Sequence, residues 1–205
     1  MDKELKSKKD IIEKSFALFL EKGYKNVTII NIMEATQLSK GAIYHHFKSK
    51  EDIYLATLDR YYFNLLQTEN LTESSGDFKT DVHFLCVFAS NLFGAIEQVV
   101  PGGMDFPIRN FFSYQLESEK NDEIREKISL SVIEYRQVVK SLVIAAKERG
   151  QIKEHLDPET ISIQIIGLLE GIAIHHSTER RDVQNTLTAI YKDIFESYLE
   201  QIVTS

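Results

Sequence analysis

Apolar residues recur at helical spacing from the beginning of the chain. Ile12 and Phe16 fall on one face of a first helix, and Gly23 stands where that helix would end. Two shorter apolar stripes follow, with Thr28 and Ser39 placed to cap their first turns. The pattern therefore predicts three helices ending near residue 47, the second and third short and separated by a tight turn.

The rest of the chain repeats the helical pattern. Ser49-Lys50-Glu51-Asp52 resembles a capping box at the start of a fourth helix, and Asp157-Pro158-Glu159 combines a capping acid with proline in the first turn. Asp182 is placed to cap the last helix, Pro101-Gly102-Gly103 breaks the pattern, and residues 70–78 are typical of a loop. No strand or hairpin pattern occurs. We therefore predict an all-α chain of about nine helices.

The charge is divided unevenly along the chain. Residues 1–50 contain ten Lys and six Asp or Glu, a balance of +4, whereas the whole chain has a net charge of −7, which leaves −11 for residues 51–205. A small basic end on an acidic body indicates that only the N-terminal part contacts a polyanion.

Composition excludes several other classes of protein. No apolar run is long enough to span a bilayer, the N-terminus lacks the apolar segment of a signal peptide, and the single Cys86 cannot form an internal disulfide. We expect a cytoplasmic protein without a membrane partner. There is no Gly-rich phosphate loop, nucleophile elbow or H-E-x-x-H motif, so we expect no enzyme, no catalytic residues and no cofactor.

The histidines and the cysteine do not form a metal site. His83 and Cys86 are three residues apart on a predicted helix, but two ligands do not make a tetrahedral site. His45 and His46 are adjacent on a helix, so their rings diverge and cannot hold one ion. We expect no metal, and we assign this second pair to DNA contact or packing.

The segment from Thr28 to Ile53 carries the strongest functional signal. Two short helices joined by a turn around Gln37 have helix-turn-helix geometry, in which the second helix enters the major groove. Gly41 and Ala42 are small enough for the backbone to approach base edges. Three further residues of this segment carry groups suited to bases or phosphates: Lys40, Tyr44 and His45. Lys50 and Thr28 stand at helix N-termini, which favour phosphate.

Residues 39–53, SKGAIYHHFKSKEDI, resemble the TetR-family pattern S-x-G-x-x-Y-x-H-F-x-x-K-E-x-L. Phe19, Gly23, Thr28 and Ile32 match further positions of the family, and the resemblance covers about residues 6–66. It implies a repressor that binds an inverted repeat in double-stranded DNA as a homodimer and is released by a small molecule. The candidate DNA-binding residues are Thr28, Ser39, Lys40, Gly41, Ala42, Tyr44, His45, His46 and Lys50.

The resemblance divides these residues by role. It implies phosphate contacts for Thr28, Tyr44 and Lys50, and a position in the major groove for the start of the third helix. One residue departs from the pattern, because Gln37 stands where the family has Gly. If that position needs a positive φ, the side chain costs about 1 kcal/mol.

Two apolar helices predict a dimer interface. The segment 161–174 is apolar nearly all round, so it must be covered on both sides, and Gly167 and Gly171 allow close approach on one face. The last helix places further apolar residues beside it. The predicted interface comprises Ile163, Gly167, Gly171, Ile190, Ile194 and Tyr198. The alternative is that these residues all pack inside one monomer.

The middle of the chain is rich in aromatic residues and predicts a ligand pocket. The candidate lining is Phe84, Phe88, Phe106, Arg109, Phe112, Tyr114, Tyr135 and Glu170. We expect an unidentified hydrophobic or aromatic effector, whose charge, if it has one, would meet Arg109 or Glu170. Residues 1–50 would then form the DNA-binding domain and residues 51–205 the ligand-binding and dimerisation domain, with the fourth helix reaching about residue 66 as connector.

Overall fold

The computed structural model describes residues 2–63, 74–99, 105–118 and 122–204. Within these ranges the predicted all-α fold of about nine helices is confirmed, and the extended pairing is a single bridge between Ile152 and Val203. The helices are α1 (Asp2–Lys22), α2 (Ile29–Thr36), α3 (Lys40–His46), α4 (Lys50–Thr57), which continues as a π-helical segment (Leu58–Phe63), α5 (Phe78–Gln98), α6 (Pro107–Ser118), α7 (Asp122–Glu148), α8 (Pro158–His175) and α9 (Val183–Ile202).

Most helix starts follow from their own sequence. Ser39 Oγ accepts the backbone N–H of Ala42, and Asp157 Oδ2 accepts that of Thr160, so both predicted caps are confirmed. Ser49 Oγ likewise accepts the N–H of Asp52. The Asp52 carboxylate, however, accepts the N–H of Lys48 rather than that of Ser49, so the fourth helix carries a variant of the predicted capping box.

The predicted cap of the last helix is wrong. Asp182 has a left-handed backbone, with φ 57°, and makes no side-chain cap hydrogen bond. The carboxylate of Glu97, at the end of α5, accepts the N–H groups of Asp182 and Val183 at 2.8 and 3.0 Å instead. A carboxylate at a helix N-terminus satisfies unpaired N–H groups and the helix dipole, and here a distant helix supplies it.

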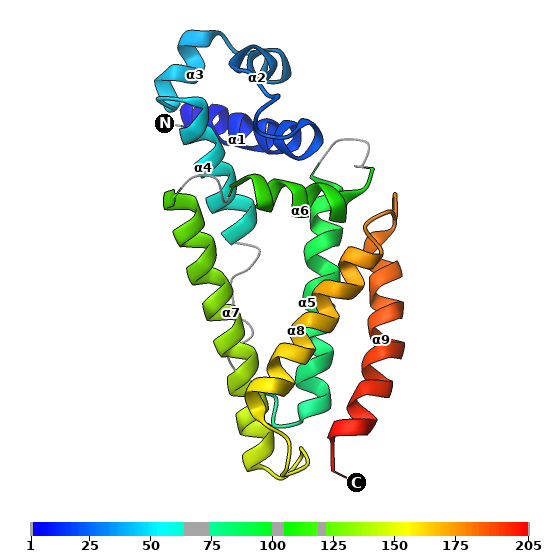
Figure 1. Cartoon of the computed structure of the whole chain (residues 1–205). Helices are drawn as coiled ribbons and strands as arrows, with labels where there is room; N and C mark the ends of the chain where they lie inside the picture. The colour runs from blue at the N-terminus through cyan, green and yellow to red at the C-terminus, as the bar shows by residue number, and fades with distance from the viewer. Residues whose placement is uncertain (1, 64–73, 100–104, 119–121, 205) are drawn as a thin grey trace.

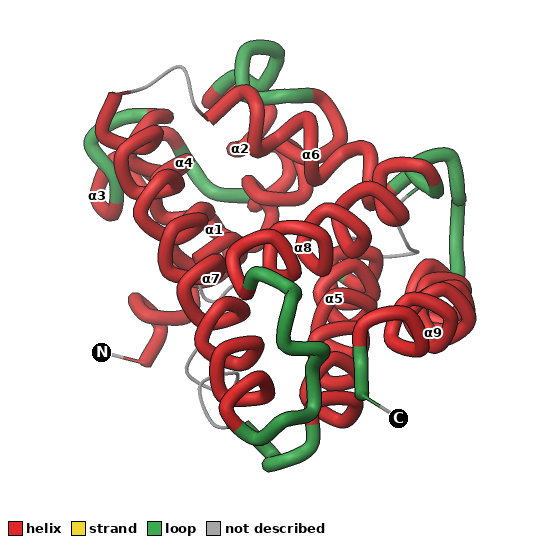
Figure 2. The backbone as a smooth tube through the Cα atoms, turned by 60° about the horizontal axis from the view of Figure 1, so that its bottom comes forward, coloured by secondary structure: helices red, strands yellow, loops and turns green. Residues whose placement is uncertain are grey.

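The helices form two parts joined by α6. Figure 1 shows α1 to α4 together at one end of the molecule and α6 running crosswise beneath α1. The longer helices α5, α7, α8 and α9 make up the other end, where α9 packs along α5 and α8 packs along α7 (Figure 2). Phe16, Tyr54 and Tyr114 are buried where α1, α4 and α6 meet.

Two predicted features fall outside the described residues. These are the Pro101-Gly102-Gly103 break and the end of the fourth helix beyond residue 63. Across the ranges that the structure covers, none of the helices has the length and apolar character needed to cross a membrane.

Candidate DNA-binding surface and effector cavity

The turn between α2 and α3 places α3 on the surface. Gln37 ends α2 with a left-handed backbone, φ 58° and ψ 28°. This position, where the family pattern has Gly, therefore does have a positive φ. The side-chain amide of Gln37 donates to the carbonyl of Glu34 at 2.7 Å. Ile43 is completely buried and anchors α3 against the core. One face of α3 is thereby fixed inward and the opposite face outward.

The outer face of α3 carries most of the residues predicted to meet DNA. Lys40, Gly41, Tyr44 and His45 are exposed, and Ala42 is half-buried. The Lys40 ammonium lies 5.8 Å from the centre of the Tyr44 ring, so a cation and a phenol hydroxyl project side by side. This is an arrangement suited to phosphates and base edges in the major groove.

His46 and Thr28 are already engaged within the chain. His46 lies half-buried on the inner side of α3, and its Nε2 is 2.7 Å from Ser7 Oγ on α1. The Thr28 hydroxyl accepts the N–H of Asn31 and donates to the Asn31 side chain, forming a reciprocal cap of α2. His46 therefore positions α3 against α1, and Thr28 remains exposed at a helix start where N–H groups favour anions.

Lys50 is also engaged within the chain. Its ammonium donates to the carbonyls of Tyr24 and Val27, both at 2.8 Å, and lies 4.1 Å from the centre of the Tyr24 ring. These carbonyls belong to the connection between α1 and α2. In this structure Lys50 therefore fastens α4 to that connection, and the phosphate contact predicted for it stays a prediction.

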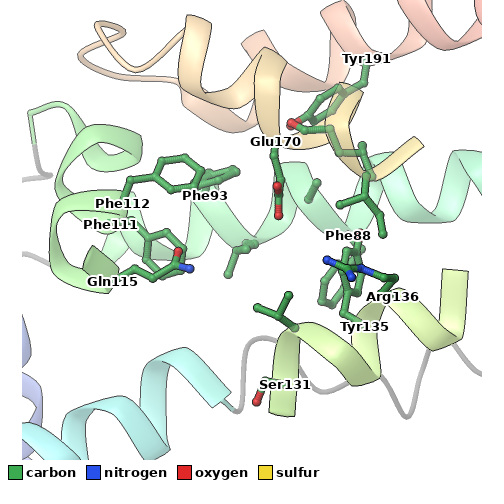
Figure 3. A pocket seen from close by; sticks show the side chains of 15 residues that line it. Phe88, Phe93, Phe111, Phe112, Gln115, Ser131, Tyr135, Arg136, Glu170 and Tyr191 are labelled. Atoms are coloured by element: carbon green, nitrogen blue, oxygen red, sulfur yellow. The ribbon is translucent and has the colours of Figure 1, made fainter. Parts of the chain in front are cut away.

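A cavity of about 160 Å³ opens between α5, α6, α7 and α8, with one residue from α9. Its lining is mostly aromatic and aliphatic: Phe88, Ala89, Leu92, Phe93, Phe111, Phe112, Val132, Tyr135, Ile166, Leu169 and Tyr191, with the polar side chains of Gln115, Ser131, Arg136 and Glu170 (Figure 3). An apolar cavity with few polar groups has the composition of a small-molecule site.

The structure brings half of the predicted lining together. Phe88, Phe112, Tyr135 and Glu170 line this cavity, and the other predicted residues do not. The Phe84 side chain is 58% exposed on α5. Phe106 precedes α6 with a φ of 58°, and its ring lies 4.1 Å beneath the Arg109 guanidinium. Tyr114 is buried at the junction with α4.

These misses have a common physical cause. Composition shows that a segment is aromatic, but the direction of each ring depends on how α5 and α6 pack on their neighbours. Arg136 and Tyr191 line the cavity but were not predicted, because nothing in the sequence marks them. Tyr191 fits the apolar register of α9, and Arg136 lies between the polar residues Glu134 and Gln137 of α7, so neither differs in sequence from an ordinary core or surface residue.

Glu170 and Arg136 give the cavity its charge. Glu170 is the acid and Arg136 the base among the described residues that line it. Burial raises the pKa of the Glu170 carboxyl above its ordinary value, and the nearby Arg136 opposes that rise without cancelling it. Glu170 is exposed on the open side of the cavity, and its carboxylate is still partly desolvated. Burial also raises the pKa of Tyr135, with Glu170 contributing, so the phenol stays protonated.

Helix α6 joins the cavity to the DNA-binding end. Phe111, Phe112 and Gln115 line the cavity, and Tyr114 points the other way into α4. Tyr54 on α4 donates to the carbonyl of Tyr114 at 3.0 Å, and the two hydroxyls of Thr57 and Tyr114 lie 2.8 Å apart. All of these α4 contacts are buried, so α4 and α6 are joined by hydrogen bonds that solvent does not reach.

The outer face of α8 and α9 is apolar and uncovered in the single chain. Ile163 and Ile194 are 50% and 37% exposed. A Cβ atom built on Gly167 or Gly171 would meet no atom of the described segments within 4 Å. The Tyr198 hydroxyl donates to Gln164 at 2.8 Å and ties α9 to α8 beside this face.

Comparison with known proteins identifies the N-terminal segment. Residues 11–57 match the family model described as "Bacterial regulatory proteins, tetR family". The chain is 26% identical over 189 residues to the helix-turn-helix-type transcriptional repressor DhaR of Mycobacterium sp. strain GP1, covering 91% of each chain. Residues 11–57 therefore form a helix-turn-helix of the TetR family. The chain is a helix-turn-helix DNA-binding transcriptional regulator.

Solved structures of TetR-type regulators share the whole fold. A TetR regulator from Chloroflexus aurantiacus superposes with a TM-score of 0.70 at 25% identity and covers both chains fully. A transcriptional regulator from Saccharomonospora viridis, solved in complex with choline, also gives 0.70 at 22% identity, over 98% of this chain and 99% of that one. The TetR-type arrangement therefore extends beyond the helix-turn-helix to the helices around the cavity.

Proposed function

We propose that this TetR-family chain is a dimeric repressor that leaves its operator when a small molecule fills the cavity. Two copies of α3 would occupy successive major grooves of an inverted repeat, about 34–36 Å apart or somewhat more. Residues 1–50 would form the DNA-binding domain and residues 51–205 the ligand-binding and dimerisation domain. The naming of DhaR as a repressor supports repression rather than activation.

The exposed face of α3 supports the DNA contacts. Lys40, Gly41, Ala42 and His45 would face base edges, and Tyr44 would contact a phosphate from the same helix. Ser39 contributes by capping α3 and leaving its first turn accessible. Thr28 would present the N-terminus of α2 to a second phosphate.

The apolar outer face of α8 and α9 supports the dimer. Ile163, Gly167 and Gly171 recur at helical spacing on α8, and Ile190, Ile194 and Tyr198 do so on α9. A second copy related by a two-fold axis would bury both stripes in a four-helix interface. Close approach of backbones at the two glycines would be possible because no atom of the described residues lies within 4 Å of a Cβ built on either one.

One observation carries the ligand response. The same helix, α6, lines the cavity with Phe112 and Gln115 and holds α4 through Tyr114. A ligand that displaces α6 would move α4 and with it the helix-turn-helix, so the distance between the two recognition helices would change. Such a ligand binds the displaced form more tightly than the DNA-bound form, which is the requirement for coupling. The choline complex of the Saccharomonospora viridis regulator supports a small-molecule site in this fold.

The experiment begins with an operator selected by the protein from a pool of random duplex DNA. We expect the selected sequences to be inverted repeats and the affinity to fall steeply with salt. Small apolar compounds that raise the melting temperature are then added, and operator affinity is measured again. A decrease of about 5–150-fold is expected for a coupling of 1–3 kcal/mol. Selected sites without two-fold symmetry, or ligands that stabilise the protein and leave operator affinity unchanged, would contradict the proposal.

A further inference from the structure

Glu170 is a carboxylate directed into an aromatic cavity. Figure 3 shows it extending from α8 between the rings of Phe93 and Phe112 on one side and Phe88 on the other. Within the described part of the chain, no hydrogen bond or ion pair engages its carboxylate. Glu170 as a whole is exposed through the open side of the cavity, but its carboxylate is partly desolvated there, and this costs free energy unless a partner of opposite charge joins it.

The rings beside Glu170 favour the same sign of partner. Phe93, Phe111 and Phe112 form a cluster with centroids 5.9–6.0 Å apart. The faces of aromatic rings are electronegative and attract cations, with an effect that grows when the cation is desolvated. The hydroxyl of Tyr135, held protonated by burial, adds a polar group on the opposite wall.

Arg136 is the competing feature of this cavity. It would attract an anion, and its presence reduces the local negative potential around Glu170. Both charged residues are exposed, but Arg136 extends from α7 next to Phe88 and Tyr135, whereas Glu170 extends from α8 between the rings of Phe112 and Phe88 (Figure 3). No described contact pairs it with Glu170, so the carboxylate is available to a ligand from the cavity side.

The volume limits the size of the ligand. A dry cavity of about 150 Å³ holds a benzene molecule, and this one measures about 160 Å³. A single ring with a short side chain therefore matches the space, with further atoms accommodated through its open side.

We infer that the effector of this regulator is a small amphipathic cation, whose ammonium group pairs with Glu170 and whose apolar body packs on Phe93 and Phe112. This inference rests on the proposed function, because it assigns the chemical class of the molecule that fills the same cavity. An anionic ligand on Arg136 and a neutral ligand without a charged anchor are the alternatives.

Three soluble probes of nearly equal size separate these classes. They are 2-phenylethylammonium, 2-phenylethanol and phenylacetate, which place a cation, a neutral hydroxyl and an anion next to the same ring. Their dissociation constants are measured by calorimetry on the full chain. We expect the cation to bind about tenfold more tightly than the alcohol, as one desolvated charge pair implies, and the anion most weakly. Equal affinity of cation and alcohol, preference for phenylacetate, or no cation binding at millimolar concentration would overturn the inference.

Three variants test whether Glu170 causes the preference for the cation. Glu170→Gln keeps the size and shape of the side chain and should reduce cation affinity about tenfold to the level of the alcohol, with alcohol affinity unchanged. Glu134→Gln removes the same charge from an exposed α7 residue outside the cavity lining and should leave all three affinities unaltered. Arg136→Gln should preserve or increase cation affinity. A cation preference that survives Glu170→Gln in a folded protein would overturn the inference.

Operator release is read separately with the selected DNA. If the cation binds through Glu170 and operator affinity does not change, the proposed ligand response fails and the assignment of ligand class stands. If only the alcohol or phenylacetate releases the operator, the assignment of ligand class fails and the proposed function stands.

Discussion

The hydroxyl of Tyr54 on α4 donates a hydrogen bond to the backbone carbonyl of Tyr114 on α6, over 3.0 Å and away from solvent. The two rings also meet edge to face, with centroids 5.0 Å apart. Thr57, one turn further along α4, adds its hydroxyl to that of Tyr114. The DNA-binding end and the helix that lines the cavity are thus joined by directional bonds as well as by apolar packing.

Tyr54→Phe should uncouple the two ends without emptying the core. The ring packing is retained and one buried hydrogen bond is lost, so we expect a loss of about 1 kcal/mol in unfolding free energy. Operator affinity and effector affinity measured separately should change little, whereas the ratio of operator affinities with and without effector should approach one. Thermal melting serves as the folding control. A variant with an unchanged ratio would show that the bond is structural only.

Lys50→Ala should act through the fold of the helix-turn-helix. Two backbone carbonyls and the Tyr24 ring lose their cation, so the connection between α1 and α2 loosens. We expect a lower melting temperature and weaker operator binding with an unchanged dependence on salt. Lys40→Ala is the matched control because it removes the same charge from the exposed face of α3. In Lys40→Ala the melting temperature should stay the same, and the preferred operator sequence should change. If Lys50→Ala instead lowers the salt slope by about one, Lys50 binds a phosphate.

Gly94→Ala tests how closely α5 and α9 pack. A methyl group at this position would lie 2.7 Å from Oε1 and 2.8 Å from Cβ of Gln184 on α9. The amide end can rotate away, but the Cβ atom is fixed to its helix, so the two helices must separate. We expect a loss of about 1–3 kcal/mol in unfolding free energy. Gly41→Ala adds the same methyl 3.9 Å from its nearest neighbour and should keep or raise the melting temperature. Equal melting temperatures for both variants would contradict the tight contact.

Local features of the fold could be predicted because their causes lie within a few residues. Ser39, Asp157 and Pro158 act on the next turn of their own helices, and Gln37 takes a left-handed turn set by adjacent residues. The cap of α9 could not be predicted, since Glu97 lies 85 residues before Asp182 and meets it only after α5 and α9 pack.

The candidate site divides along the same line. The outward face of α3 follows from helical periodicity once Ile43 is assigned inward. The cavity depends instead on four helices whose relative rotation is a tertiary property. Phe84 and Phe88 are one turn apart on α5 and equally apolar in sequence, yet only the second reaches the cavity. Lys50 matches the family pattern in sequence, but its hydrogen bonds to the connection between α1 and α2 could be seen only in the structure.

Glu170→Gln should stabilise the unliganded protein at neutral pH. Burial raises the pKa of this carboxyl above the ordinary 4.5, so the charged form is held at a cost in the folded state, although Arg136 reduces that cost. The cost is complete above the folded pKa and disappears as the pH falls through that value toward 4.5, because the carboxyl then binds a proton. The groups that face it are Arg136 and Tyr135 from α7 and Tyr191 from α9.

The measurement is the difference in melting temperature between the variant and the parent across a pH series. We expect the variant to melt higher at neutral pH and the difference to shrink as the solution is acidified. Glu134→Gln, exposed on α7, should show no such trend. A variant that melts lower than the parent at neutral pH would mean that Glu170 is stabilised by a partner in the unliganded protein.

Ile194→Glu and Gly167→Glu should release monomers and abolish operator binding together. Ile194 is 37% exposed in the single chain, and the space above Gly167 is empty to 4 Å, so neither substitution disturbs the interior of one protomer. In a two-fold interface each would bury a pair of like charges against apolar surface, which no dimer of this kind tolerates. Leu130→Glu on α7 is the matched control, because Leu130 is 54% exposed and belongs to a different face.

Light scattering at micromolar concentration should give a dimer for the parent and for Leu130→Glu, and a monomer for Ile194→Glu and Gly167→Glu. The melting temperatures should show that the monomers remain folded. Their loss of operator binding in a gel shift would then follow from the missing second recognition helix, since one half-site supplies only part of the contacts. A monomeric parent, or an Ile194→Glu variant that stays dimeric, would move the interface away from α8 and α9.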